Sequence, residues 1–311
     1  MTETAEIPHA KTLKQKVWNI AKLLLKIAVT TVLLWYVFKQ VPFKEVKYRL
    51  FHANYWWMLA AVGCFFLSTV VSSWRLLSFF KAIHLKLDPR FNLRLYLLGM
   101  FYNFLLPGGI GGDGYKIWLL NKRYNLSGKK VFWAILFDRL SGLWAIGLLT
   151  CLFKLLIPQI PISFFVPFSI FVAGTIIYYF VIYKFFHDIT SRFLEAHGKA
   201  VLVQSLQVTT IILVMLGQDF HGKFAPYLLS FLLSALAAVL PTLGGAGARE
   251  AIFTKLSYYF NMQVGLAVFL SVSFYLISLV VALFGIYYLL RPSRLEDGLP
   301  PIQENSLQEQ S

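Results

Sequence analysis

Apolar residues run along this chain in long, nearly continuous stretches, and most charged residues lie between them. An α-helix needs about 20 mostly apolar residues to cross a membrane. Six stretches reach that length, namely residues 20–38, 56–80, 130–153, 164–186, 200–218 and 264–290. The pattern therefore predicts an all-α, polytopic membrane helix bundle with about six full spans.

Two further apolar stretches, residues 93–106 and 225–240, break off in Leu-Pro followed by glycines. The breaks read "LPGGIGGDGYK" from Leu106 and "LPTLGGAGARE" from Leu240. Proline breaks a helix, and non-helical backbone at membrane depth is tolerated only inside protein or beside a water-filled cavity. We therefore predict that 93–124 and 225–260 are re-entrant broken hairpins. Simple loops between two full spans are the alternative.

Basic residues are distributed unevenly between the predicted spans. By the positive-inside rule, the lysine- and arginine-rich links 81–94, 116–130 and 184–199 belong on the cytoplasmic side. These links share one side, with both chain termini cytoplasmic, if the two broken stretches are re-entrant. The basic link 39–54 runs against the rule, because the same topology puts it outside.

The predicted topology divides the chain into two similar halves. Repeat one covers about 17–155 and repeat two about 160–291, and each contains two spans, a broken hairpin and one more span. Three crossings per half put the second half in the opposite orientation, which is the inverted repeat common among transporters. We expect a single integral membrane domain over 17–291, with flexible tails at 1–16 and 292–311.

Composition excludes several other classes of protein. Hydrophobic residues make up 58% of the 311 residues and the mean hydropathy is +0.65, which is typical of a membrane protein. The net charge of +15 would suggest a nucleic-acid partner in a soluble protein, but here the basic links explain it. The sequence contains no Cys/His cluster with metal-ligand spacing and no nucleotide-binding G-x-x-x-x-G-K-[ST] loop. We expect no metal, no cofactor, no signal peptide and no nucleic acid.

The two breaks provide the elements of an anion site. A helix that restarts near Asp113 and Lys116 would point its positive N-terminal end at a cavity, and Arg249 would approach from the other side. Phosphate or carboxylate headgroups are the predicted ligands. Asp113 could instead act only as the N-cap of a helix over 114–122. The predicted backbone lining of the cavity comprises Pro107, Gly108, Gly109, Gly111, Gly112, Pro241, Gly244, Gly245 and Gly247.

The stretch "AILFDRLSGLWAIGLL", residues 134–149, carries Asp138 and Arg139 inside a predicted span. Ionisable residues at that depth usually face a cavity or a partner. The two point about 100° apart on a helix and so do not pair with each other. We expect Arg139 to meet the anion and Asp138 to hold Arg249 or Lys116, with a structural ion pair between helices as the alternative. Arg75 is expected to extend to the membrane interface. The predicted substrate-binding residues are Asp113, Lys116, Asp138, Arg139, Arg249 and Glu250.

Three stretches, "PGGIGGDGYKIWLL", "FDRLSGLWA" and "LPTLGGAGAREAIF", resemble the signatures of the flippase-like domain family. This family comprises the transmembrane region of lysylphosphatidylglycerol synthases and related glycosylation-associated membrane proteins. The resemblance covers about 17–291 and implies an integral protein of the plasma (inner) membrane. Five of the predicted site residues match the family's polar positions. At Lys116 the family usually has arginine, so the charge is kept but the bidentate fork is lost.

The resemblance implies a translocase (flippase) that moves an anionic phospholipid or a polyprenyl-linked substrate between leaflets. We expect no catalytic residue and no enzyme activity, since lysyl transfer belongs to a separate soluble domain that these residues do not contain. A membrane-embedded lipid-headgroup enzyme is one alternative, although the six histidines lie in predicted tails or links. An accessory membrane subunit of a lipid or glycan pathway, serving a separately encoded partner enzyme, is another.

Overall fold

The computed structural model describes residues 43–105, 110–124, 126–158, 160–236, 248–295 and 297, and within them it contains helices but no strand. The predicted span 20–38 lies outside these residues, as do the predicted cavity residues other than Gly111 and Gly112. Five described helices are long and apolar enough to cross a membrane: α3 (Tyr55–Ala82), α6 (Gly128–Lys154), α7 (Phe165–Phe185), α9 (Phe193–Leu216) and α12 (Val264–Leu290). The prediction of an all-α polytopic membrane bundle is thereby confirmed.

The start of α9 differs most from the prediction. The helix begins at Phe193, whereas the sequence pattern predicted a span from residue 200 and a link before it. Its first two turns bury Phe193, Ala196 and His197 in the protein core. Glu195 and Lys199 make this segment less hydrophobic, so the sequence pattern did not predict it as part of a span. Packing in the core nevertheless holds it in the helix.

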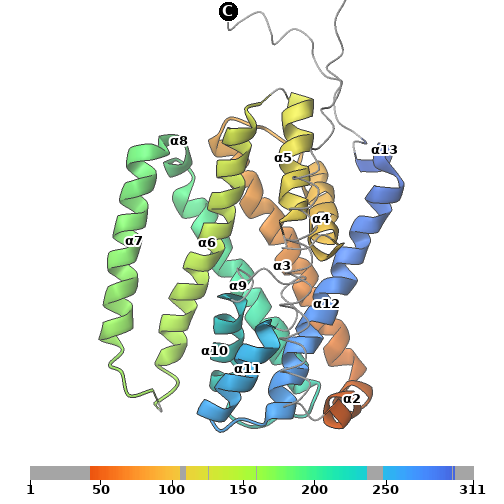
Figure 1. Ribbon diagram of the computed structural model, residues 1–311, viewed down its shortest axis with the longest axis vertical. Helices are drawn as coiled ribbons and strands as arrows, with labels where there is room; N and C mark the ends of the chain where they lie inside the picture. The colour runs from red at the N-terminus through yellow and green to blue at the C-terminus, as the bar shows by residue number, and fades with distance from the viewer. Residues whose placement is uncertain are drawn as a thin grey trace, which may run out of the picture.

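The two broken stretches fold into two pairs of shorter helices. The first pair is α4 (Pro89–Leu105) and α5 (Gly111–Tyr124), and the second is α10 (Phe224–Ala235) and α11 (Ala248–Tyr259). The members of each pair pack on each other, and the two pairs lie at opposite ends of the bundle (Figure 1). The longest, α4 with 17 residues, extends for about 25 Å, which is short of the roughly 30 Å hydrocarbon core.

Helix packing follows the same pattern in both halves of the chain. The long helices α3 and α9 pack against each other at the centre. The last long helix of the first half, α6, packs on α10, and the last long helix of the second half, α12, packs on α4. In each half, the last long helix therefore packs against the short-helix pair of the other half.

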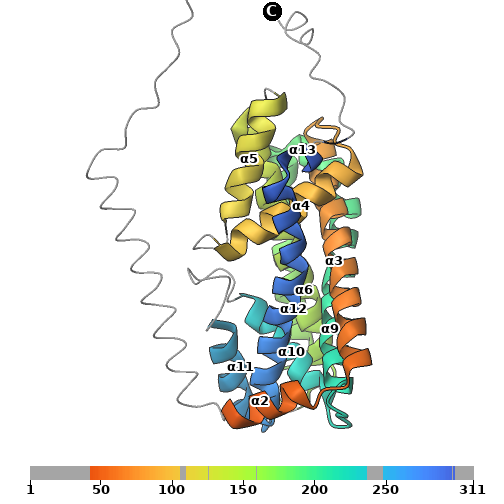
Figure 2. The ribbon, with the colours of Figure 1, turned by 90° about the vertical axis from the view of Figure 1, so that its right-hand side faces the viewer.

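Three small helices lie at the ends of the bundle: α2 (Phe43–Phe51), α8 (His187–Thr190) and α13 (Pro292–Leu295). Helix α2 lies across the end that carries α10 and α11 (Figure 2). Arg49 of α2 donates to the Gln263 side chain at 3.0 Å, and Gln218 donates to the Arg49 carbonyl at 3.0 Å. The basic segment that contradicted the positive-inside rule is thus fixed at the end opposite α4 and α5.

Two glycines allow the helices around α4 to approach backbone to backbone. A Cβ atom at Gly112 of α5 would lie 1.9 Å from the carbonyl oxygen of Gly99 in α4. A Cβ atom at Gly285 of α12 would lie 2.4 Å from the carbonyl oxygen of Leu97. Both distances are far below van der Waals contact, so α4 is held tightly between α5 and α12.

Candidate functional site

Asp113, in the first turn of α5, lies between two cations. Its Oδ1 accepts from Lys116 Nζ at 3.3 Å, and its Oδ2 accepts from the Arg139 guanidinium of α6. Lys116 also lies over the Tyr96 ring, 4.5 Å from its centroid. Two cations share one carboxylate, so these three residues together carry one net positive charge. The Arg139 side chain is 46% exposed, which leaves part of that charge accessible.

Asn103 of α4 provides the helix-capping contact that the sequence had suggested for Asp113. Helix α5 begins at Gly111, and the Gly112 amide donates to Asn103 Oδ1 at 2.8 Å. Asp113 lies inside the first turn, so the prediction that it is an N-cap is wrong. Sequence reasoning missed Asn103, although asparagine is a preferred capping residue and lies just before the Leu-Pro break.

Asp138 of α6 forms a buried ion pair with Arg75 of α3. The Arg75 Nε and Nη2 atoms donate to the two carboxylate oxygens at 2.8 and 3.1 Å, and both side chains are only 8% exposed. Gly142 leaves room for this guanidinium, since a Cβ atom there would lie 3.3 Å from Arg75 Nη1. Asp138 therefore holds neither Arg249 nor Lys116, and Arg75 does not extend to the interface. The structure thus shows at Asp138 an ion pair between two helices, as the alternative supposed.

Arg249 lies in the first turn of α11, in a different environment. Its guanidinium lies over the rings of Phe274 and Phe231, with 4.9 and 5.9 Å to the centroids. In the described part of the chain it forms no ion pair with a carboxylate. The neighbouring Glu250 accepts a hydrogen bond from Ser271 of α12 at 2.9 Å. Arg249 is therefore held by cation–π contacts and by the charge of Glu250 nearby, and not by a described ion pair.

Arg249 lines a cavity of about 230 Å³ where the C-terminal end of α4 meets the start of α11. Asn103 of α4, Gln207 of α9 and Ser278 of α12 supply polar groups to its wall, and Phe65 of α3 is among its apolar residues. The volume is below the range of about 300–1,000 Å³ for pockets that enclose drug-sized ligands. A headgroup would fit this cavity, whereas a whole lipid would not.

The structure thus separates the predicted site residues into three groups. Asp113, Lys116 and Arg139 form one cluster. Arg249 lines the cavity, whose wall includes Asn103, and Asn103 also accepts from the amide of Gly112, the residue before Asp113. Asp138 lies in a structural ion pair. Gly112 packs on Gly99 and is not among the residues that line the Arg249 cavity.

Polar residues inside the long apolar stretches could have revealed more of this cavity from the sequence. Gln207 and Ser278 lie within long apolar stretches, where polar groups commonly mark a cavity. His197, predicted to lie in a link, is buried in α9 and stacks on Phe193 with centroids 3.9 Å apart. Its Nδ1 contacts the Phe193 carbonyl at 2.8 Å, and it does not line the Arg249 cavity.

Comparison with known proteins identifies the family of the chain. The comparison with curated proteins finds none that matches it. The family model described as the lysylphosphatidylglycerol synthase TM region matches residues 23–285, which is most of the chain and includes every helix that lines the Arg249 cavity except the last turn of α12. The chain therefore belongs to the family of the transmembrane region of lysylphosphatidylglycerol synthases, membrane proteins related to lipid or glycan pathways.

Proposed function

We propose that this protein is a translocase that carries an anionic lipid, or a lipid-linked substrate with an anionic headgroup, between membrane leaflets. The observation that carries the proposal is Arg249, a cation that forms no described ion pair and lines a cavity between two broken helix pairs. The family's relation to lipid pathways supports a lipid as the ligand.

The energetics of Arg249 favour an anionic ligand. Taking a guanidinium out of water costs several kcal/mol unless it is paired, and cation–π contacts return only about 2 kcal/mol. A phosphate would complete the site, because a guanidinium binds its oxygens through two parallel hydrogen bonds. Asn103 and Gln207 offer further amide donors in the same wall. The Arg249 cavity therefore favours the binding of an anion.

The two short-helix pairs provide a physical basis for alternating access. Both act as re-entrant hairpins, one entering from each side, and the packing pattern that repeats between the halves supports an inverted repeat. The basic links beside α4 and α5 lie on the cytoplasmic side by the positive-inside rule. The chain termini are then cytoplasmic, and the protein lies in the plasma membrane.

Transport suits the cavity better than headgroup chemistry does. The described residues that line it include no histidine, cysteine or carboxylate that could serve as a general base. A separately encoded enzyme would then make or consume the lipid, and this chain would move it.

The proposal is tested by reconstituting the protein in vesicles with a headgroup-labelled anionic phospholipid and measuring its exchange between leaflets. We expect exchange by the wild type and at least a tenfold loss in Arg249→Ala. Arg192→Ala serves as the matched control, since Arg192 forms an exposed ion pair with Glu195 and does not line the cavity. Exchange that survives Arg249→Ala, in a variant reconstituted to the same level, would contradict the proposal.

A further inference from the structure

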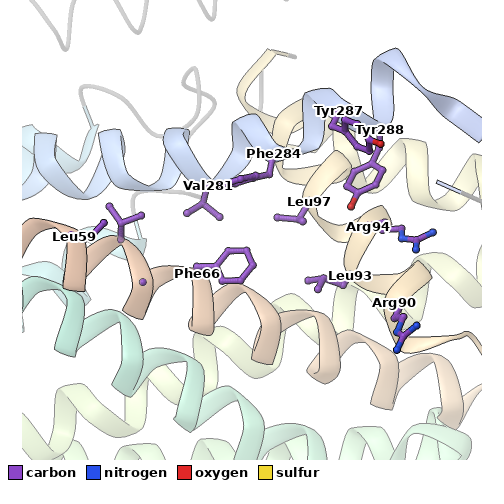
Figure 3. A pocket seen from close by; sticks show the side chains of 12 residues that line it. Leu59, Phe66, Arg90, Leu93, Arg94, Leu97, Val281, Phe284, Tyr287 and Tyr288 are labelled. Atoms are coloured by element: carbon purple, nitrogen blue, oxygen red, sulfur yellow. The ribbon is translucent and has the colours of Figure 1, made fainter. Parts of the chain in front are cut away.

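A second, larger hollow lies on the outside of the bundle, between α3, α4 and α12 (Figure 3). Its volume is about 710 Å³, within the range of about 300–1,000 Å³ for ligand pockets. Leu59 and Phe66 of α3 face Val281 and Phe284 of α12 across it. We name this hollow the lateral groove; it shares no lining residue with the Arg249 cavity.

The lateral groove is apolar along its body and basic at one end. Arg90 and Arg94 of α4 lie at that end, and Arg94 lies between Arg90 and the two tyrosines of α12, Tyr287 and Tyr288 (Figure 3). Nη1 of Arg94 donates to the carbonyls of Arg294 and Asp297 at 2.9 and 3.0 Å, which leaves its other donors for a ligand. Neither arginine forms an ion pair with a described carboxylate.

The spacing of the two arginines adds a second argument for a bound anion. Residues at positions i and i+4 of a helix are neighbours, and like charges in such a pair repel each other. Arg90 and Arg94 have this spacing on α4. An anion between the guanidinium groups would remove the repulsion and complete the hydrogen bonds of both.

We propose that the lateral groove binds one anionic glycerophospholipid, with its phosphate on Arg90 and Arg94 and an acyl chain along the apolar body. An apolar protein helix would fill the body of the groove but leave both cations unpaired. A phospholipid matches both the apolar body and the basic end of the groove, because it joins an alkyl chain to a negative charge. Binding here does not depend on translocation, so this proposal can fail or hold separately from the proposed function.

Gly63 of α3 allows the groove to be blocked without disturbing the helix. A Cβ atom at Gly63 would meet no atom within 4 Å, so Gly63→Leu would project into open groove space. Gly174 of α7 is a matched control, since a Cβ atom there also meets nothing within 4 Å and α7 does not line the groove. Both substitutions replace a helical glycine by a better helix former, so neither should harm folding.

The test measures binding of phosphatidylglycerol and of phosphatidylcholine with the same acyl chains to the full-length protein in detergent. We expect the wild type and Gly174→Leu to bind the anionic lipid at least tenfold more tightly than the zwitterionic one. Gly63→Leu should weaken binding of both lipids at least tenfold. Arg90→Gln should remove most of the preference for the anionic lipid while the protein still binds acyl chains. Equal binding by Gly63→Leu and the wild type would overturn the proposal.

A cross-linking experiment identifies the occupant directly. A photoreactive benzoylphenylalanine in place of Phe66, which lines the groove and is 36% exposed, is activated in vesicles that contain phosphatidylglycerol. We expect an adduct with the mass of the lipid, abolished by Gly63→Leu. A cross-link to a peptide from residues 20–38 would overturn the proposal, since the predicted first span would then occupy the groove.

Discussion

The two short-helix pairs handle their buried charges in opposite ways. Beside α4 and α5, the cations near the bundle interior are matched by carboxylates, as Lys116 and Arg139 are by Asp113 and Arg75 is by Asp138. At the start of α11, Arg249 lies over two aromatic rings and forms no described ion pair. The cations beside α4 and α5 are therefore held by ion pairs, whereas Arg249 is held by aromatic rings, with the charge of Glu250 nearby.

This difference separates structural charges from functional ones. Removing one member of a buried ion pair leaves the other uncompensated, which costs about 3–5 kcal/mol. Removing a cation that forms no ion pair abolishes a desolvation cost and leaves no ion-pair partner behind. Proteins commonly sacrifice stability at sites kept ready for a ligand. The stability of point variants can thus show which arginine is held for a substrate.

The largest effect is expected for Arg75→Met. The change leaves Asp138 buried without a partner, and we expect a loss of about 3–5 kcal/mol in the free energy of unfolding. Thermal unfolding in detergent measures it. The double variant Arg75→Met/Asp138→Leu is the control and should recover most of the loss. A single variant as stable as the wild type would mean that the pair is not a structural element.

Gly112→Ala tests the close approach of α5 to α4, on which the paired cluster depends. The added methyl group would overlap the Gly99 carbonyl, and the forced separation should cost about 1–3 kcal/mol. Gly114→Ala is the control in the same helix, because a Cβ atom there meets nothing within 4 Å. That variant should be unchanged or stabilised by up to about 1 kcal/mol. Equal stabilities of the two alanine variants would contradict the packing of these helices.

Arg249→Met provides the sharpest contrast with Arg75→Met. We expect a free energy of unfolding within about 1 kcal/mol of the wild type, or above it, because removing the desolvation cost of the guanidinium offsets the lost attraction to Glu250. Anionic lipid should raise the melting temperature of the wild type, since a ligand at 100 times its Kd stabilises by about 2.7 kcal/mol. The Arg249→Met protein should lose the part of that shift that depends on its cavity. A stability loss as large as that of Arg75→Met would identify Arg249 as a structural residue.

The long helices could be predicted from sequence because a membrane demands long apolar stretches. The helix pairs could be predicted because proline and glycine interrupt two such stretches in the same way. The partner of Asp138 could not be predicted, since Arg75 is 63 residues away and the pairing depends on how two helices are rotated against each other. The contact between Asn103 and Gly112 depends on the angle between α4 and α5, which the sequence does not encode locally. The sequence therefore predicted which types of residue form the site, but only partly which residues contact each other.

Arg139→Ala is expected to have the smallest effect on stability and tests whether the first half also contributes to the anion site. Half-exposed ion pairs contribute up to about 1 kcal/mol, and Asp113 would keep Lys116 as a partner. Arg192→Ala is an apt control, because the Arg192 side chain is also 46% exposed and also paired with a carboxylate. If the excess positive charge beside Asp113 attracts the headgroup, Arg139→Ala should slow leaflet exchange several-fold and Arg192→Ala should not, with the difference shrinking at high salt. Equal exchange by the two variants would confine the anion site to Arg249 and make the α4/α5 pair a purely structural counterpart of the α10/α11 pair.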